Sequence, residues 1–275
     1  MSYGPLEVTK VTPHYWRATI NLPPFNLAGP EFFLGLWDLL QDVEIDKHLK
    51  VLVFDSALPD FFISHYDLQK APSIPPDLLA KWPVMMVKLA TIPVISVAAI
   101  RGRTRGIGSE FVLACDIRFG SEEKAILSQA EVSFGLLPGG GGMELLPRQV
   151  TRGRMLEIVC GGDEFDAATS AAYGWINRAV PDAEFETFVD RFARRVAGWE
   201  KASLISSKKL TNQRFGLPKV EEISESTQTM GRLWVNPEVQ KKMQLLFQKG
   251  LERDRDVELN IAEFTAKHAT WFTEG

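Results

Sequence analysis

The sequence predicts an α/β fold, because strand-like and helix-like segments alternate over roughly its first 200 residues. Two short runs rich in β-branched residues, Val51 to Phe54 and Val94 to Ile100, have the length and apolarity of buried strands. Over Glu31 to Val43, apolar residues recur at three- and four-residue steps, as on the buried face of a helix. No internal repeat of fixed period is visible.

Composition sets the broad class of the protein. The chain has 275 residues, 45% hydrophobic and 24% charged, which is typical of a globular protein and excludes a disordered chain, collagen and a coiled-coil rod. At roughly 150 residues per domain, this length makes one large domain or two ordinary ones. A net charge of −4 lacks the basic excess of nucleic-acid-binding proteins, so we expect no nucleic-acid partner.

Cysteine usage and the apolar runs predict a cytoplasmic protein. Cys115 and Cys160 lie outside any CxxC or Cys/His cluster, so we expect neither a disulfide framework nor a metal site. The amino terminus lacks the pattern of a signal or transit peptide. No apolar run approaches the ~18 to 20 residues of a membrane helix, so we expect no membrane association.

The first half of the chain combines strands with one long irregular segment. Tyr15 to Leu22 is a predicted strand that ends at Pro23 and Pro24. Pro59 to Pro83 contains five prolines, which exclude a continuous helix or a central strand there. Because loops of this length usually carry function, His65 is the one histidine of four that we retain as a candidate.

The second half of the chain becomes helical. Ile117 to Phe119 and Ala125 to Leu127 are the last strands we predict before the helical pattern begins near residue 150. That pattern is clearest over Glu184 to Trp199, whose aromatic stripe we interpret as core packing and not as a cofactor site. The helices of the carboxyl-terminal third are interrupted at Gly216 to Pro218, Asn236 to Pro237 and Gly250.

Several catalytic motifs are absent, namely the phosphate loop, the dinucleotide-binding glycine motif, the nucleophile elbow and the HExxH zinc motif. The segment Gly106 to Asp116 is the candidate that remains. Its two glycines permit a tight turn after a predicted strand, and the apolar residues that follow begin a helix. The unpaired backbone N–H groups of a helix start suit a developing oxyanion.

Two glutamates accompany this turn. Glu110 lies in the first turn of the predicted helix, where the helix dipole alone also favours a carboxylate. Glu131 stands just before the glycine-rich segment Gly135 to Gly142. Two carboxylates in one pocket can divide acid and base roles, since burial and mutual repulsion separate their pKa values. Spacing alone leaves this open, because 35 acidic residues offer many such pairs.

A family resemblance rests on the segments Pro93 to Gly102, Gly106 to Asp116, Gln129 to Glu131, Gly135 to Gly142 and Ala168 to Ile176. Together they resemble the enoyl-CoA hydratase/isomerase, or crotonase, superfamily, and the resemblance extends from about Arg17 to Phe272. It implies a crotonase-like spiral of ββα units over residues 1–200 with the acyl-CoA site, and a C-terminal helical region over 201–275. That region would serve oligomerisation and complete part of the CoA site. The implied partners are an acyl-CoA thioester and further copies of the chain, in a homotrimer or hexamer, with no cofactor beyond the coenzyme A of the substrate.

The resemblance also implies roles for single residues. Glu110 and Glu131 match the two glutamates with which hydratases of the family handle a water molecule and the α-carbon proton. The backbone N–H groups of Tyr66 and Ile107 would form the oxyanion hole, since Phe62 to Leu68 is similar to the family element Phe-Ser-Ala-Gly-x-Asp-Leu. The further substrate-binding positions are Ile63, Ser64, Asp67, Leu68, Gly106, Pro138, Gly139, Phe264 and Lys267.

The sequence departs from the family pattern at several positions. His65 and Ile107 stand where glycine is usual, Ala130 replaces a usual proline, and Leu259-Asn260 stands where Glu-Gly is frequent. We expect the bulk of Tyr66 and Ile107 to reshape the acyl pocket, and His65 to alter the backbone angles of its loop. A short basic cluster is interpreted as a solvated or salt-bridged loop and not as a CoA phosphate site: Arg101, Arg103 and Arg105.

These observations favour an enoyl-CoA hydratase-like lyase. The expected reaction is the reversible hydration of a 2-enoyl-CoA thioester through an enolate-like state held in the oxyanion hole, with the two glutamates as acid and base. The alternatives are an enoyl-CoA isomerase and an aryl-propenoyl-CoA hydratase-lyase. A homologue that binds acyl-CoA or a protein partner with little turnover is the alternative of a different class. Which glutamate is the acid stays open.

Overall fold

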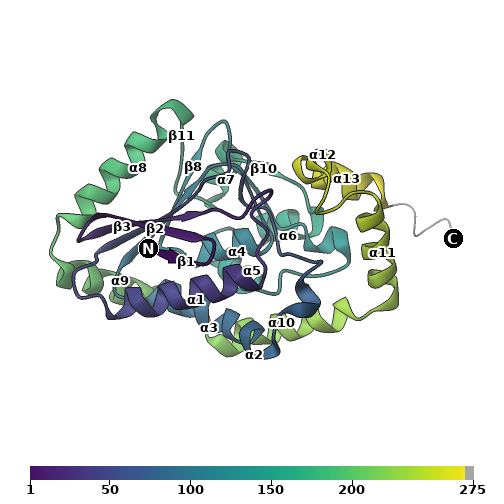
Figure 1. Cartoon of the computed structure of the whole chain (residues 1–275), viewed down its shortest axis with the longest axis horizontal. Helices are drawn as coiled ribbons and strands as arrows, with labels where there is room; N and C mark the ends of the chain where they lie inside the picture. The colour runs from purple at the N-terminus through teal and green to yellow at the C-terminus, as the bar shows by residue number, and fades with distance from the viewer. Residues whose placement is uncertain (270–275) are drawn as a thin grey trace.

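The computed structural model of the chain describes residues 1–269 (Figure 1). Phe272, where the family resemblance ends, and the last residues of the 201–275 region lie outside the described residues. Within residues 1–269, no helix is long and apolar enough to cross a membrane.

A seven-stranded sheet forms the centre of the fold, in the spatial order β1-β2-β3-β4-β6-β8-β11. The strands from β3 to β11 are parallel, whereas β1, β2 and β3 pair antiparallel. The strands of this sheet are β1 (Ser2–Tyr3), β2 (Leu6–Thr12), β3 (Tyr15–Ile20), β4 (Val51–Ser56), β6 (Ile95–Ile100), β8 (Ile117–Ser121) and β11 (Arg178–Val180).

A second, four-stranded sheet has the order β10-β9-β7-β5. Its strands are β5 (Phe61–Ile63), β7 (Arg103–Arg105), β9 (Ile126–Ser128) and β10 (Phe165–Asp166). Each successive pair, β4 with β5, β6 with β7 and β8 with β9, places its first strand in the large sheet and its second in the small one. With the intervening helices, this repetition is the predicted spiral of ββα units.

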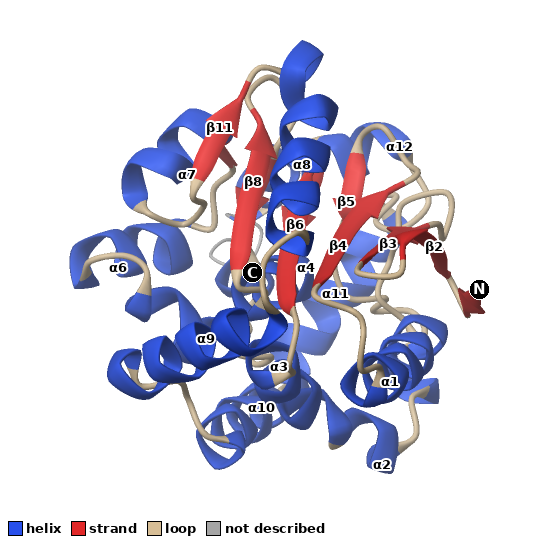
Figure 2. Cartoon of the chain, turned by 90° about the vertical axis from the view of Figure 1, so that its left-hand side faces the viewer, coloured by secondary structure: helices blue, strands red, loops and turns tan. Residues whose placement is uncertain are grey.

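Helices cover both faces of the large sheet, because residues alternate between its two faces along each strand. Val51 and Val53 of β4 pack in one cluster with Phe185 and Val189 of α8, which lies in front of the sheet in Figure 2. The opposite face belongs to the main core with α1, α3 and α4. The interpretation of the aromatic stripe as core is therefore confirmed, except that α8 ends at Ala197 and Trp199 is 51% exposed.

The α-helices of the described chain are α1 (Pro30–Ile45), α2 (Pro76–Leu79), α3 (Lys81–Thr91), α4 (Ile107–Ala114), α5 (Gly142–Leu145), α6 (Arg152–Gly161), α7 (Ala167–Tyr173), α8 (Asp182–Ala197), α9 (Lys201–Phe215), α10 (Val220–Trp234), α11 (Pro237–Gln248), α12 (Arg255–Leu259) and α13 (Ile261–Lys267). Three 3₁₀ turns accompany them: η1 (Ala71–Ser73), η2 (Glu131–Phe134) and η3 (Leu146–Arg148).

The segment Pro59 to Pro83 is less irregular than its prolines predict. It contains β5 and α2, and α3 begins within it at Lys81. Pro76 opens α2 and Pro83 lies in the first turn of α3. In the first turn a backbone N–H has no intrahelical partner to lose, so proline is tolerated there. The strands β1 and β2 near the amino terminus were not predicted.

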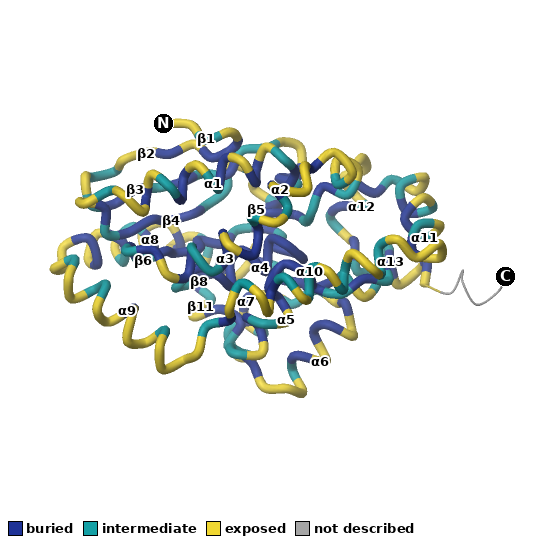
Figure 3. Tube along the Cα trace, turned by 90° about the horizontal axis from the view of Figure 1, so that it is seen from below, coloured by how far each residue is buried: buried dark blue, intermediate teal, exposed yellow. Residues whose placement is uncertain are grey.

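Helices α9 to α13 follow the spiral core, and α9, α10 and α11 end at the interruptions that the sequence predicts. In Figure 1, α11, α12 and α13 lie together at one end of the molecule, away from the large sheet. They form a separate small core with η2, in which Phe134, Met243, Leu246 and Ile261 pack together. Figure 3 shows buried strands at the centre and largely exposed outer helices such as α9.

Candidate active site

A cavity of about 300 Å³ lies between the spiral core and α10. The ends of several strands and turns of the core supply one wall, and α10 supplies Thr227, Met230, Gly231 and Trp234. Its lining is largely apolar and aromatic, with Phe33, Leu68, Leu79, Trp82, Phe134 and Leu136 among the lining residues. A cavity of this character suits an apolar ligand held by a few polar groups.

Glu110 lies in the wall of this cavity, in the first turn of α4. Its Oε1 accepts the backbone N–H groups of Gly140 at 2.8 Å and Gly142 at 3.0 Å, so the glycine-rich turn holds the carboxyl group. A Cβ at residue 140 would lie 2.3 Å from Glu110 Oε2 and 2.7 Å from Trp82 Nε1, so only glycine fits there. Burial raises the pKa of Glu110 to about 7, although the two N–H groups oppose this.

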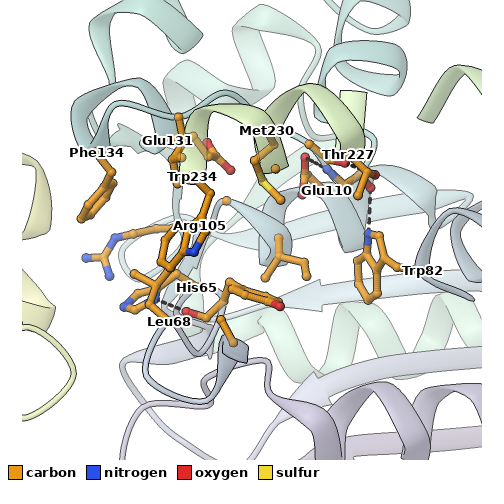
Figure 4. Close-up of a pocket in the computed structure, with 18 of the residues that line it drawn as sticks. His65, Leu68, Trp82, Arg105, Glu110, Glu131, Phe134, Thr227, Met230 and Trp234 are labelled. Atoms are coloured by element: carbon orange, nitrogen blue, oxygen red, sulfur yellow. Dashed lines mark hydrogen bonds between the residues drawn. The ribbon is translucent and has the colours of Figure 1, made fainter. Parts of the chain in front are cut away.

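Glu131 opens η2 and lines the same cavity (Figure 4). Burial, followed by the charge of Glu110, raises its pKa well above the ordinary glutamate value. In the amide orientation that satisfies its neighbours, Gln129 donates to both carboxylate oxygens of Glu131 at 3.1 Å and accepts from Ser109 Oγ at 3.2 Å. We call Glu110 and Glu131 the glutamate pair. Because the charge of Glu110 raises the pKa of Glu131, the two groups titrate together.

Two backbone N–H groups on the cavity wall have no hydrogen-bond acceptor among residues 1–269. One belongs to Ile107, the first residue of α4, and the other to Tyr66 in the loop after β5. The N–H of Ile107 is one of the unpaired donors that every helix start leaves. These are the two groups that the resemblance assigns to an oxyanion hole.

The structure brings seven of the predicted site residues to the cavity: Tyr66, Leu68, Gly106, Ile107, Glu110, Glu131 and Gly139. The other six do not line it. Ile63, Ser64, Asp67 and Pro138 are buried behind the cavity wall. Phe264 packs edge-on against His268 with ring centroids 4.9 Å apart, and Lys267 is exposed in the last turn of α13.

Two of the three arginines of the basic cluster form the ion pairs of a salt-bridged loop, whereas Arg103 donates to a backbone carbonyl. Arg101 Nε donates to Asp182 at 2.8 Å, and Arg103 Nε donates to the Leu259 carbonyl at 2.8 Å. Arg105 is buried, pairs with Glu164 and lines the cavity, so it belongs to the site.

Three further residues complete the lining, and two of them, Met230 and Trp234, carried no sequence signal. Trp82 donates its Nε1–H to the Gly140 carbonyl at 2.9 Å and lies at one end of the view in Figure 4. Met230 and Trp234 come from α10, and Figure 4 shows Met230 near the glutamate pair and Trp234 towards Arg105 and His65. Their helical spacing could have suggested one shared face, but not which element that face covers.

Within residues 1–269, no cluster of three His, Cys, Asp or Glu side chains could hold a metal ion. Cys115 is buried and Cys160 exposed, and each is a free thiol.

Comparisons with known proteins relate this geometry to a family. The sequence model of the enoyl-CoA hydratase/isomerase family matches residues 17–252. The alpha subunit of the fatty acid oxidation complex of Aliivibrio fischeri is 32% identical over 210 residues, which are 73% of this chain and 29% of that subunit. The chain thus spans less than a third of that relative.

Solved structures agree with this relation. A candidate enoyl-CoA hydratase from Streptomyces avermitilis has a TM-score of 0.91 and 37% identity, with 97% of this chain and 98% of the other covered. An enoyl-CoA hydratase from Mycobacterium avium subsp. paratuberculosis K-10 has a TM-score of 0.79 at 24% identity, with 86% and 97% covered, which supports the fold alone. Since the family model covers most of its length, the chain belongs to the enoyl-CoA hydratase/isomerase family.

Proposed function

We propose that the chain is a lyase that catalyses the reversible addition of water to the 2,3-double bond of a 2-enoyl-CoA thioester. The observation that carries the proposal is the glutamate pair, two mutually repelling carboxyl groups on the wall of one apolar cavity. Family membership supplies the acyl-CoA class of substrate. The presence of two acids favours hydration over isomerisation, because one carboxyl group can take and return the proton of an isomerisation, whereas water addition uses one group to activate water and another to give a proton to C2.

The proposed addition of water forms one C–O bond and transfers two protons. One carboxylate of the glutamate pair takes a proton from water while the hydroxyl oxygen bonds to C3. The thioester oxygen gains negative charge, and the N–H groups of Tyr66 and Ile107 stabilise it by donating hydrogen bonds to it. The other glutamate, as a carboxylic acid, gives its proton to C2. A raised pKa in both groups supports a pair that holds one proton near neutral pH.

The proposal is tested by following the loss of conjugated thioester absorbance with 2-butenoyl-, 2-octenoyl- and 3-phenylpropenoyl-CoA. We expect turnover of at least one substrate by the wild type, and a fall in kcat of about 10² to 10⁴-fold in Glu110→Gln and in Glu131→Gln. Glu122→Gln, at an exposed position remote from the cavity lining, is the matched control and should be unchanged.

Two outcomes would overturn the assignment: no turnover of any substrate by the wild type, or full activity in both glutamine variants. Activity that survives only the loss of Glu110 favours an isomerase. A thermal shift with coenzyme A in the absence of turnover favours a homologue that only binds acyl-CoA.

A further inference from the structure

Two buried carboxylates from the C-terminal region hold the loop that carries Tyr66. Glu252 accepts the backbone N–H groups of Leu68 at 2.6 Å and Gln69 at 3.0 Å. Glu252 has a φ of +62°, a left-handed conformation that is uncommon outside glycine and that the surrounding contacts must maintain. Glu258 of α12 is fully buried and accepts from the hydroxyl of Ser64 at 3.0 Å.

His65 lies between this carboxylate and the loop backbone. Its Nε2 is 3.0 Å from Glu258 Oε2, and its Nδ1 is 2.7 Å from the Tyr66 carbonyl oxygen. A carboxylate and a carbonyl only accept hydrogen bonds, so both ring nitrogens must donate. The geometry therefore requires a doubly protonated imidazolium at residue 65.

The surrounding charges agree with an imidazolium. Arg105 donates to the Ser64 hydroxyl at 3.2 Å, which directs the hydroxyl hydrogen to Glu258 and leaves that group an acceptor. Burial opposes both charges, but their attraction prevails: it raises the pKa of His65 and holds the pKa of Glu258 at about 2. Glu252 adds a second negative charge, with its Oε1 3.9 Å from His65 Nδ1. Asp67 is the other nearby acid, and its charge raises the pKa of Glu252.

The backbone contacts connect His65 to the free N–H of Tyr66. The His65 carbonyl accepts from Ala28 N–H at 2.9 Å, and the Ala28 carbonyl accepts from Asp67 N–H at 3.1 Å. In a trans peptide, C=O and N–H point in opposite directions, so the Tyr66 N–H points away from Ala28. The next peptide group joins Tyr66 to Asp67, and the imidazolium holds it by donating a hydrogen bond to the Tyr66 carbonyl oxygen. The position of the proposed oxyanion donor thus depends on contacts on both of its sides.

We propose that the His65–Glu258 ion pair is a positioning device that ties the oxyanion-hole loop to α12 and keeps the Tyr66 N–H directed at the thioester oxygen. The inference rests on the proposed function for its catalytic consequence. It assigns a role to His65, which stands where the family usually has glycine. It also assigns one to Glu258, which directly precedes Leu259-Asn260, the place where Glu-Gly is frequent in the family. The ion pair is intact while His65 is protonated, so activity falls as the pH rises through the pKa of His65.

The test measures kcat and KM from pH 5 to pH 10, with the 2-enoyl-CoA substrate of highest turnover, for the wild type, His65→Gln and Glu258→Gln. We expect His65→Gln to lower kcat about tenfold with little change in KM, because an oxyanion donor acts mainly on the transition state. In Glu258→Gln, the amide oxygen can still accept from His65 Nε2 but carries no charge to stabilise the imidazolium, so the alkaline fall in kcat moves to lower pH by about one unit while the acid limb stays.

Glu263→Gln is the matched control, since it removes the same charge at an exposed position of the neighbouring helix α13. Its profile should match the wild type. If the alkaline limb is the same in all four proteins, or if His65→Gln keeps the wild-type kcat, the inference is overturned and the cluster is structural only.

A readout independent of turnover separates this inference from the proposed function. The ring-proton NMR signal of His65, assigned by its loss in His65→Gln, should titrate above the ordinary histidine value of about 6.5 in the wild type and lower in Glu258→Gln. A wild-type His65 that titrates at or below 6.5 refutes the ion pair whether or not any enoyl-CoA is turned over. An enzyme without turnover whose His65 titrates high refutes the proposed function but not the ion pair.

Discussion

Replacing Glu110 with glutamine should stabilise the fold, and increasingly so as the pH rises. The amide oxygen of glutamine can still accept the N–H groups of Gly140 and Gly142, so the substitution removes the charge and keeps the contacts. What it removes is the cost of ionising a carboxyl group that is only 3% exposed.

The size of the effect follows from the raised pKa of Glu110. Below pH 4.5 the group is protonated in both the folded and the unfolded chain, so it does not lower the free energy of unfolding of the wild type. Between pH 4.5 and about 7 the unfolded chain ionises first, so the folded wild type is progressively destabilised. At about 1.4 kcal/mol for each pH unit, the full cost is about 3 kcal/mol above pH 7. Between pH 5 and pH 8 the variant should gain about 2 to 3 kcal/mol relative to the wild type.

Thermal unfolding at a series of pH values measures this gain. For a chain of this size, the difference in Tm between Glu110→Gln and the wild type should grow by about 5 °C from pH 5 to pH 8. Glu122→Gln, at an exposed carboxyl, should show no such growth. A Tm difference for Glu110→Gln that is constant across this range would refute the argument that burial keeps the carboxyl group protonated.

Three further predictions concern the glutamate pair, the glycine turn and a buried lysine. The pH profile of kcat/KM should be bell-shaped, with an acid limb that belongs to the glutamate pair and an alkaline limb to which both the pair and His65 contribute, and a profile without an acid limb would contradict this. Gly140→Ala should lower kcat about 10²-fold by displacing the carboxyl group of the pair, whereas Gly153→Ala, where a Cβ meets nothing within 4 Å, should not. Lys208→Ala should cost about 3 kcal/mol in unfolding experiments, because it leaves Asp116, whose side chain is only 16% exposed, without its partner at 2.7 Å, while the exposed neighbour Lys209→Ala should cost little.

Local patterns predicted the parts of the fold that depend on neighbouring residues. The turn at Gly106 with a helix after it, the buried strands and the interrupted C-terminal helices all follow from short-range preferences for φ, apolar period and chain breakage. The helix α3 was not predicted because Pro83 was interpreted as a residue that excludes a helix. Proline disrupts a helix in its interior but not in its first turn, and no side-chain cap in the sequence marks the start of α3.

The residues of the candidate site also fall into two groups, those that the sequence predicted and those that only the structure revealed. The glutamate pair and Ile107 were found in the sequence because they lie within one contiguous part of the spiral that carries the family's motifs. The partners that hold the Tyr66 loop were not found in the sequence, because Glu252 and Glu258 stand about 190 positions from His65 along the chain. Trp234 reaches the cavity only because α10 folds back over the core.

The sequence by itself thus determined the fold class, which depends on residue type at short spacing, and the family, whose motifs singled out the two acids as candidates. Only the tertiary structure decided which of the 35 acidic residues share a cavity and which positive charge faces which carboxylate. The physical reason is that pKa values, and the aim of a backbone N–H, are set by burial and by contacts between distant segments. These contacts exist only once the chain has folded.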